Sequence, residues 1–229
     1  MCGRFTLQEP KLITKRFGVS GKLPLFEPTF NAAPSQSIPI VVKRFPKRVV
    51  LMKWGFIPEW GKEKGINLIN IRSESVKEKP YFRKVLMKRR CIVPCSGFYE
   101  WRQAKDEKIP YYIYLKDKAM FGFAGLYSSL SDAEGKTIDT FAILTCPPNS
   151  FMKKLHNRMP VILNKKDESS WLDNESKGDY LLKLLKPYSS NLMKTHSVSK
   201  LVNNTRNNSK ELIKHKDKYV VVDNNTVGV

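Results

Sequence analysis

The chain has 229 residues, of which 41% are hydrophobic, so it can bury a core and is not a disordered polyelectrolyte. Lysine and arginine number 41 against 21 acidic residues, and the net charge of +20 favours a polyanionic partner over lysines that serve only solubility. No apolar run approaches the ~20 residues of a membrane span, and the opening residues MCGRFTLQEP lack the apolar segment of a secretory signal.

The predicted elements are mostly short strands rich in β-branched and aromatic residues. In chain order they are a helix at 10–17, strands at 38–42 and 49–54, a helix at 80–88, strands at 91–94, 98–102, 111–115, 120–126 and 141–146, a helix at 150–155, a strand at 160–163, helices at 169–172 and 179–185, and a strand at 219–222. Because the strands follow one another without regular intervening helices, the pattern predicts an α+β fold with mostly antiparallel pairing.

We expect one domain over residues 1–229, since no repeat or low-complexity linker divides the chain. Residues Asn225 to Val229 are expected to form a frayed tail. Without a signal or a membrane span, the protein is expected to be cytoplasmic and, given its charge, associated with the nucleoid.

Cys2 is the first residue with distinctive chemistry. If Met1 is removed, Cys2 carries an α-amine with a pKa of about 7.7–8.0 next to its thiol. The amine can add to an aldehyde, and the thiol can then close a five-membered thiazolidine ring on the imine. An internal cysteine cannot do this, because its nitrogen is an amide. Position alone does not decide between this reading and a chance cysteine.

Short motifs along the chain give Cys2 a context. They are MCGRFT, FNAAPS, KWGFIPEWG, INIRSE, GFYEW, HNRMP and VSKLVN, in that order. Together they resemble the SOS response-associated peptidase (SRAP) family from residue 2 to about residue 214. The resemblance implies a barrel-like antiparallel core with a few peripheral helices. It also implies a protein that captures the aldehyde of abasic deoxyribose in single-stranded DNA, as part of the SOS response to DNA damage.

The resemblance also implies catalytic roles. Cys2 would supply both nucleophiles, Asn70 would hold the amine end, and Glu100 would move protons during imine and ring formation. His156 would act as acid or base on the sugar oxygen. The residues alone leave alternatives open: a solvent-facing Glu100, a core histidine, and a turn or capping asparagine.

The cysteines invite a comparison with metal sites. Cys91, Cys95, Cys146 and His156 could in principle hold zinc, but Cys91 and Cys95 lie on one face of an expected strand and no knuckle glycine accompanies them. We expect buried, inert thiols, no metal and no cofactor.

Basic residues interleaved with aromatic ones predict contacts with single-stranded DNA. The candidates are Arg4, Asn31, Trp54, Trp60, Arg72, Phe82, Arg83 and Arg158. Trp54 and Trp60 are interpreted as wedges that keep a neighbouring duplex out of the cleft, which would favour junctions of single and double strands. Ordinary core packing is the alternative for both rings. The protein is expected to act as a monomer.

Three functions follow from these residues. The leading one is an abasic-site protein that forms a covalent adduct with DNA, with associated lyase chemistry and loss of Met1. The second is a peptidase or hydrolase in which Cys2 and His156 attack an amide. The third is a nucleic-acid-binding module without catalysis.

Overall fold

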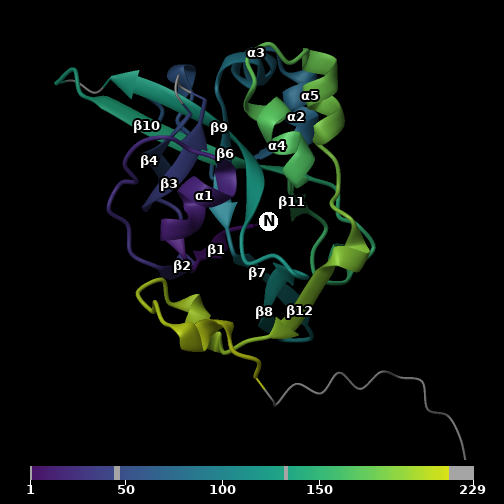
Figure 1. The fold of residues 1–229 in the computed structure, drawn as a ribbon. Coiled ribbons are helices and arrows are strands. Elements are labelled where there is room, and N and C mark those ends of the chain that lie inside the picture. Colours follow the sequence, from purple (N-terminus) through teal and green to yellow (C-terminus); the bar gives the residue numbers. More distant parts are fainter. Residues whose placement is uncertain (1, 44–46, 132–133, 217–229) are drawn as a thin grey trace, which may run out of the picture.

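Two β-sheets form the body of the protein in the computed structural model, which describes residues 2–43, 47–131 and 134–216 (Figure 1). The strands are β1 (Arg4–Leu7), β2 (Thr29–Ala32), β3 (Ser37–Val42), β4 (Arg48–Trp54), β5 (Asn70–Arg72), β6 (Arg90–Cys95), β7 (Gly97–Ala104), β8 (Glu107–Leu115), β9 (Phe121–Ser131), β10 (Thr137–Cys146), β11 (Met159–Pro160) and β12 (Met193–Ser197). The helices are α1 (Ile13–Phe17), α2 (Ser73–Glu78), α3 (Pro80–Lys88), α4 (Glu168–Leu172) and α5 (Gly178–Leu184). Short 3₁₀ turns are η1 (Pro10–Leu12), η2 (Glu59–Gly61), η3 (Met152–Lys154), η4 (Lys165–Asp167), η5 (Ser190–Leu192), η6 (Lys200–Asn203) and η7 (Lys210–Ile213).

The larger sheet closes into a small barrel. Its strand order is β11-β10-β4-β3-β6-β9, and β9 pairs back to β10. The pairings are antiparallel except those of β10 with β4 and with β5, which are parallel. Phe5 lies inside with its ring 5.1 Å from Trp54 and 6.2 Å from Phe123. The expected α+β fold with a mostly antiparallel, barrel-like core is confirmed.

The smaller sheet carries the N-terminal strand in its interior. Its order is β12-β8-β7-β1-β2, with every neighbouring pair antiparallel. In β1 and β7, Arg4 is opposite Tyr99 and Phe5 is opposite Phe98. This register fixes the backbone that leads to Cys2.

Helices α2, α3, α4 and α5 gather at one side of the barrel (Figure 1). Helix α3 has the predicted bounds, because Pro80 suits the first helical position and Phe82, Val85 and Leu86 form one buried face. No helix among the described residues is both long and apolar enough to span a bilayer.

Several elements differ from the expectation. The helix expected at 10–17 is a 3₁₀ turn followed by α1, which ends at Gly18 with a φ of 59°. The helix expected at 150–155 is only η3. Strands β1, β2, β5 and β12 and helix α2 are additional. The strand expected at 219–222 and the tail from Asn225 to Val229 lie outside the described residues.

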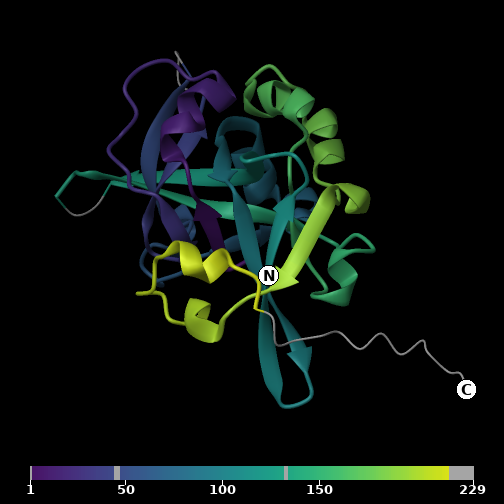
Figure 2. The same ribbon diagram turned by 60° about the horizontal axis from the view of Figure 1, so that its bottom comes forward.

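The chain beyond β12 returns to the N-terminal strands. Turns η6 and η7 lie beside β2, as Figure 2 shows from below. The Phe30 N–H donates to the Asn208 side chain at 2.6 Å, which fixes this return on the β2 backbone. The segment that carries VSKLVN is therefore part of the folded unit.

Two arginines connect helices to the rest of the fold, the half-buried Arg16 and the buried Arg90. Arg16 in α1 makes a bidentate pair with Glu168 in α4, at 2.8 and 2.7 Å. Arg90, 4% exposed, donates to the carbonyls of Leu86, Trp171 and Asp173. Because its partners are carbonyls at the ends of α3 and α4, Arg90 satisfies acceptors that those helices leave open.

Candidate functional site

Cys2 is fully buried and held by its backbone. The Asn70 Nδ2 donates to the Cys2 carbonyl oxygen at 2.9 Å. Asn70 begins β5, whose parallel pairing places it opposite Ile143 in β10. The barrel therefore positions Asn70, and Asn70 positions Cys2.

The second polar atom of Asn70 is available. Its Oδ1 is buried and has no hydrogen-bond partner among the described residues. A buried acceptor without a donor is costly and uncommon in native proteins. This carbonyl can accept a hydrogen bond from a donor next to Cys2.

Burial controls the thiol of Cys2. Its sulfur makes a weak hydrogen bond to the Arg4 carbonyl, with the two atoms 3.8 Å apart. Burial raises the pKa of the Cys2 thiol well above its usual value, and the nearby Glu100 carboxylate raises it further. In this environment the thiol is protonated at neutral pH and needs a base before it can attack.

Glu100 and His156 line one open cleft of about 520 Å³, together with Arg4, Trp101, Lys108 and Asn203. Glu100 is only 4% exposed, so its solvent-facing alternative is wrong. Burial lowers the pKa of His156, and the charge of Glu100 opposes that change. Both side chains can exchange protons with a ligand in the cleft.

The four predicted catalytic residues therefore come together. Asn70 bonds to Cys2, and the charge of Glu100 acts on both Cys2 and His156. They come from β5, the approach to β1, strand β7 and the loop before β11.

The remaining cysteines lie in the core. Cys91, Cys95 and Cys146 are buried free thiols, and burial raises the pKa of each. Within residues 2–43, 47–131 and 134–216, no three His, Cys, Asp or Glu side chains form a group that could hold a metal ion.

Comparison with known proteins places this site in a family. A family model described as SOS response associated peptidase (SRAP) matches residues 1–205. The chain belongs to the SRAP family. It is 43% identical to abasic site processing protein YoqW of Bacillus subtilis (strain 168), over 93% of this chain and 99% of that protein. It is 30% identical to abasic site processing protein HMCES of Mus musculus, over 93% of this chain and 75% of that protein.

A crystal structure of a protein from Bacteroides thetaiotaomicron has the same fold, with a TM-score of 0.86 and 28% identity. The match covers 94% of this chain and 100% of the Bacteroides chain. The same fold therefore covers nearly the whole chain.

Among the predicted DNA contacts of this SRAP chain, Trp60, Arg72 and Arg83 are accessible. Trp60 is 51% exposed and makes an edge contact with Tyr81, whose ring centroid lies 6.0 Å away. Arg72 is exposed at the end of β5, and Arg83 makes an exposed pair with Asp179 at 3.5 Å. These three side chains can meet DNA without unfolding.

A basic groove of about 420 Å³ adjoins Tyr81 and also includes Lys84, Lys88 and Arg89. Lys84 and Lys88 are not among the DNA contacts that the sequence predicts. Lys84 and Lys88 follow Tyr81 by three and seven residues along α3, so all three lie on one helical face. This spacing could have indicated that the two lysines share a groove with Tyr81.

The predicted DNA contacts of Trp54 and Phe82 are corrected by their burial. Trp54 is 0% exposed, stacks on Phe141 at 6.1 Å and donates from Nε1 to the Ile69 carbonyl. Phe82 is 6% exposed and packs near Phe56 at 6.3 Å. Neither ring presents a face to a ligand, so both serve the core.

Asn31 and Arg4 are engaged inside the SRAP fold. The Asn31 Nδ2 donates to the carbonyls of Val202, Asn204 and Asn207. Arg4 donates to the Asn31 Oδ1 at 2.8 Å, and to the carbonyls of Val202 and Asn203 at 2.7 and 3.1 Å. Asn31 is 2% exposed, so its predicted DNA contact is corrected to a structural role; Arg4 still lines the cleft.

Arg158 also forms an internal ion pair. Its guanidinium holds Glu74 at 2.6 and 2.8 Å, and the pair lowers the pKa of Glu74 to about 2. The Arg158 side chain is 14% exposed. Its phosphate contact stays a prediction, which this internal pair does not test.

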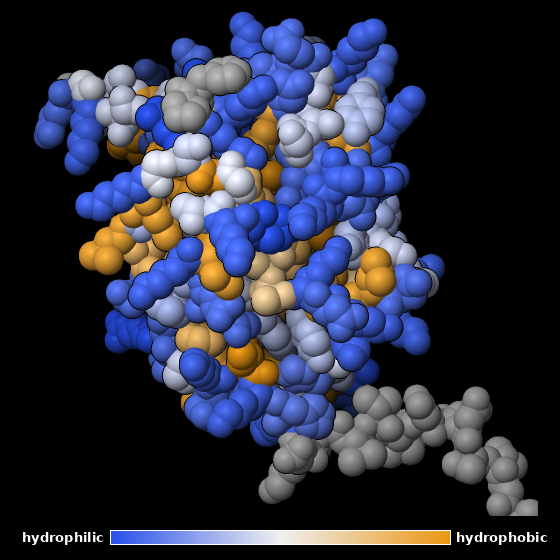
Figure 3. All heavy atoms as spheres, viewed as in Figure 1, coloured by the Kyte–Doolittle hydropathy of each residue, from blue (hydrophilic) through white to orange (hydrophobic). Residues whose placement is uncertain are grey.

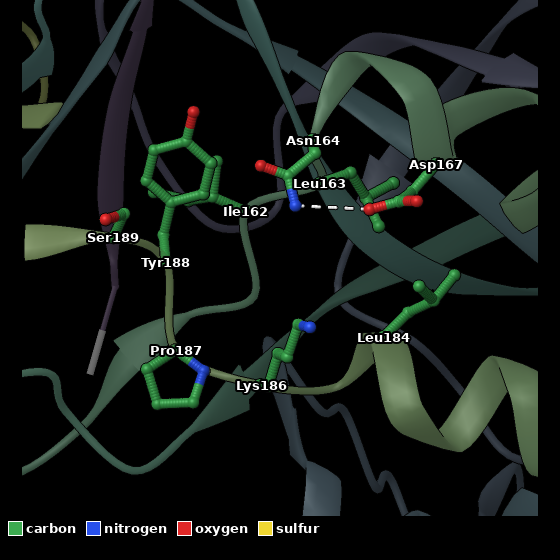
Figure 4. A pocket seen from close by; sticks show the side chains of 9 residues that line it. All are labelled: Ile162, Leu163, Asn164, Asp167, Leu184, Lys186, Pro187, Tyr188 and Ser189. Atoms are coloured by element: carbon green, nitrogen blue, oxygen red, sulfur yellow. Dashed lines mark hydrogen bonds between the residues drawn. The ribbon is translucent and has the colours of Figure 1, made fainter.

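Another hollow, of about 370 Å³, lies apart from the predicted residues. Figure 4 shows its lining, in which Asn164 donates to Asp167 at 3.1 Å. It includes none of the predicted catalytic or DNA-binding residues.

On the face shown in Figure 3, hydrophilic side chains predominate and apolar ones form small separate groups.

Proposed function

We propose that this chain processes abasic sites in single-stranded DNA by forming a covalent thiazolidine between Cys2 and the deoxyribose aldehyde. The observation that carries the proposal is the meeting of Cys2, Asn70, Glu100 and His156, of which Glu100 and His156 line one open cleft. The names of its SRAP relatives, abasic site processing proteins, support it.

The proposed chemistry begins after Met1 has been removed. The His156 ring assists opening of the cyclic sugar by proton exchange at the sugar oxygen. The Cys2 amine adds to the aldehyde carbon to give a carbinolamine. The Glu100 carboxylate takes a proton from the nitrogen and passes it to the hydroxyl, which leaves as water, so that an imine remains. Glu100 then takes the thiol proton while the sulfur bonds to the imine carbon, and the nitrogen receives a proton as the ring closes. The free Oδ1 of Asn70 orients the amine.

A lyase activity is part of the proposal. An imine acidifies the neighbouring C2′ hydrogen, so its removal by a base allows β-elimination of the 3′ phosphate. Loss of Met1 at Cys2 is the peptidase-like step that we propose for this chain.

The partner in this proposal is single-stranded DNA. Trp60 stacks on a base or on the end of a neighbouring duplex, and Arg72 and Arg83 hold phosphates. A monomer has all the residues that the proposal requires. A place on the nucleoid in the cytoplasm is consistent with the charge of +20.

The test is incubation with uracil-glycosylase-treated single-stranded DNA, followed by a denaturing gel. We expect a shifted band with wild-type protein and none with Cys2→Ser, because a hydroxyl cannot form a stable thiazolidine. A peptidase nucleophile would keep some activity as serine, and a binding module would give no covalent band in any variant. A retained N-terminal tag should abolish the band, whereas a C-terminal tag should not; a normal band with the N-terminal tag in place would refute the mechanism.

A further inference from the structure

We infer that Glu74 is a positioning residue for His156, which it holds through Arg158 with the neutral ring protonated on Nε2. The inference rests on the proposed function, in which His156 exchanges a proton with the sugar. It assigns a role to a residue that lies outside the cleft lining.

The first link is the ion pair. Glu74 accepts from both terminal nitrogens of Arg158, at 2.6 and 2.8 Å, and Arg158 also donates to the Thr145 carbonyl at 2.8 Å. The Arg158 Nε is buried without a partner among the described residues. Within that part of the chain, the hydrogen bonds of the side chain are therefore made by its two terminal nitrogens. A bidentate pair of this kind fixes the orientation of the guanidinium as well as its position.

The second link is the backbone of Arg158. Its N–H donates to the His156 Nδ1 at 3.0 Å. A neutral imidazole has one donor and one acceptor, so a ring that accepts at Nδ1 carries its proton on Nε2. The hydrogen bond thus gives His156 an N–H donor for the sugar ring oxygen, which must gain a proton when the sugar opens.

The third link is the chain around Glu74. Glu74 lies in the first turn of α2, which directly follows the strand that begins with Asn70. Thr145 belongs to β10, the strand that pairs with β5. The ion pair therefore fixes the loop of His156 to the same framework that holds Asn70 and Cys2.

The experiment compares Glu74→Gln with wild-type protein by ¹⁵N NMR of the imidazole rings, whose two nitrogen shifts distinguish the tautomers. The chain has three histidines, so His156→Ala assigns the signal. We expect the Nε2–H form in wild type and a mixture of tautomers in Glu74→Gln. Adduct formation should be slower by up to about 100-fold, as expected when a catalytic group loses its alignment.

Glu168→Gln is the matched control, because it weakens another bidentate pair, with Arg16, at 2.8 and 2.7 Å. It should leave the His156 tautomer and the adduct rate unchanged. If Glu74→Gln does not fold, Arg158→Lys provides the same test, since lysine keeps the charge but cannot form the bidentate pair.

An unchanged tautomer and rate in Glu74→Gln would overturn the inference. A slower rate with an unchanged tautomer would also overturn it, because Glu74 would then act by another route. If the tautomer shifts in Glu74→Gln, the positioning role of Glu74 is supported. If His156→Ala is at the same time fully active, the proposed role of His156 is refuted while the positioning of its ring stands.

Discussion

Asn70 donates a hydrogen bond to the Cys2 carbonyl at 2.9 Å, and it joins a three-residue strand of the barrel to the residue with the proposed nucleophiles. The bond orients the Cys2 backbone, while the buried Oδ1 of Asn70 remains open to a donor. One side chain therefore fixes where the amine lies and can select its direction.

Asn70→Ala should slow adduct formation by about 10²-fold, because the reacting amine loses its alignment. The rate can be measured with excess protein on a denaturing gel. Asn164→Ala removes another asparagine side-chain bond, in the hollow of Figure 4, and should react normally. Equal rates for the two variants would exclude a positioning role for Asn70.

Glu100→Ala and His156→Ala should each slow the reaction by about 10²–10⁴-fold and leave binding to intact single strands nearly unchanged. An aldehyde analogue that cannot cyclise should rescue His156→Ala more than Glu100→Ala, since only the former acts in ring opening. Rescue of both variants to the same degree, or of neither, would remove the support for these separate roles.

Trp60→Ala should weaken single-strand binding by about 1–3 kcal/mol, the usual contribution of one stacked base. Arg72→Ala should reduce the slope of log affinity against log salt by about 0.7. Fluorescence anisotropy on abasic and intact strands measures both, with Trp60→Phe as the control that retains a ring. A loss confined to abasic strands would show that the side chain serves the chemistry instead.

Arg90→Met should lower the free energy of unfolding by at least about 2 kcal/mol, because the carbonyls of Leu86, Trp171 and Asp173 lose their donor. Urea unfolding provides the measurement. Arg48→Met changes an exposed arginine of β4 and should stay within about 0.5 kcal/mol of wild type. Similar stabilities for the two variants would contradict the conclusion that the hydrogen bonds of Arg90 stabilise the fold.

Acid should weaken the Glu74 pair. Because the pair lowers the pKa of Glu74 from 4.5 to about 2, its stabilisation is present above pH 4.5 and is lost as the pH falls towards 2. Glu74 is 41% exposed, so we expect a contribution of only about 0.2–1 kcal/mol. Urea unfolding at pH 3 and pH 6 should therefore show a smaller difference in Glu74→Gln than in wild type.

Local patterns predicted the long elements well. Helix α3 has the bounds that the sequence predicts, and the barrel strands follow runs of β-branched and aromatic residues. The same patterns could have placed Trp54 inside, since Met52 and Trp54 are buried on either side of exposed Lys53. The strand β5 has only three residues, which is too few to show a period.

The contacts between distant segments could not be predicted in this way. The Arg158 and Glu74 pair joins residues 84 positions apart, and no local pattern shows that a guanidinium is already engaged. The family resemblance supplied Cys2 and the three residues around it, whereas their distances and burial required the folded chain. The same applies to Asn31, whose three carbonyl acceptors come from the other end of the chain.

The bonds from Arg4 to the carbonyls of Val202 and Asn203 span 198 and 199 residues. At roughly 5–20 residues per second, about 10–40 s of synthesis separates the two ends of these contacts. Long-range contacts of this kind raise the contact order and slow folding. The strand next to Cys2 is thus synthesised well before these partners, and its last hydrogen bonds form only after Val202 and Asn203 have been synthesised.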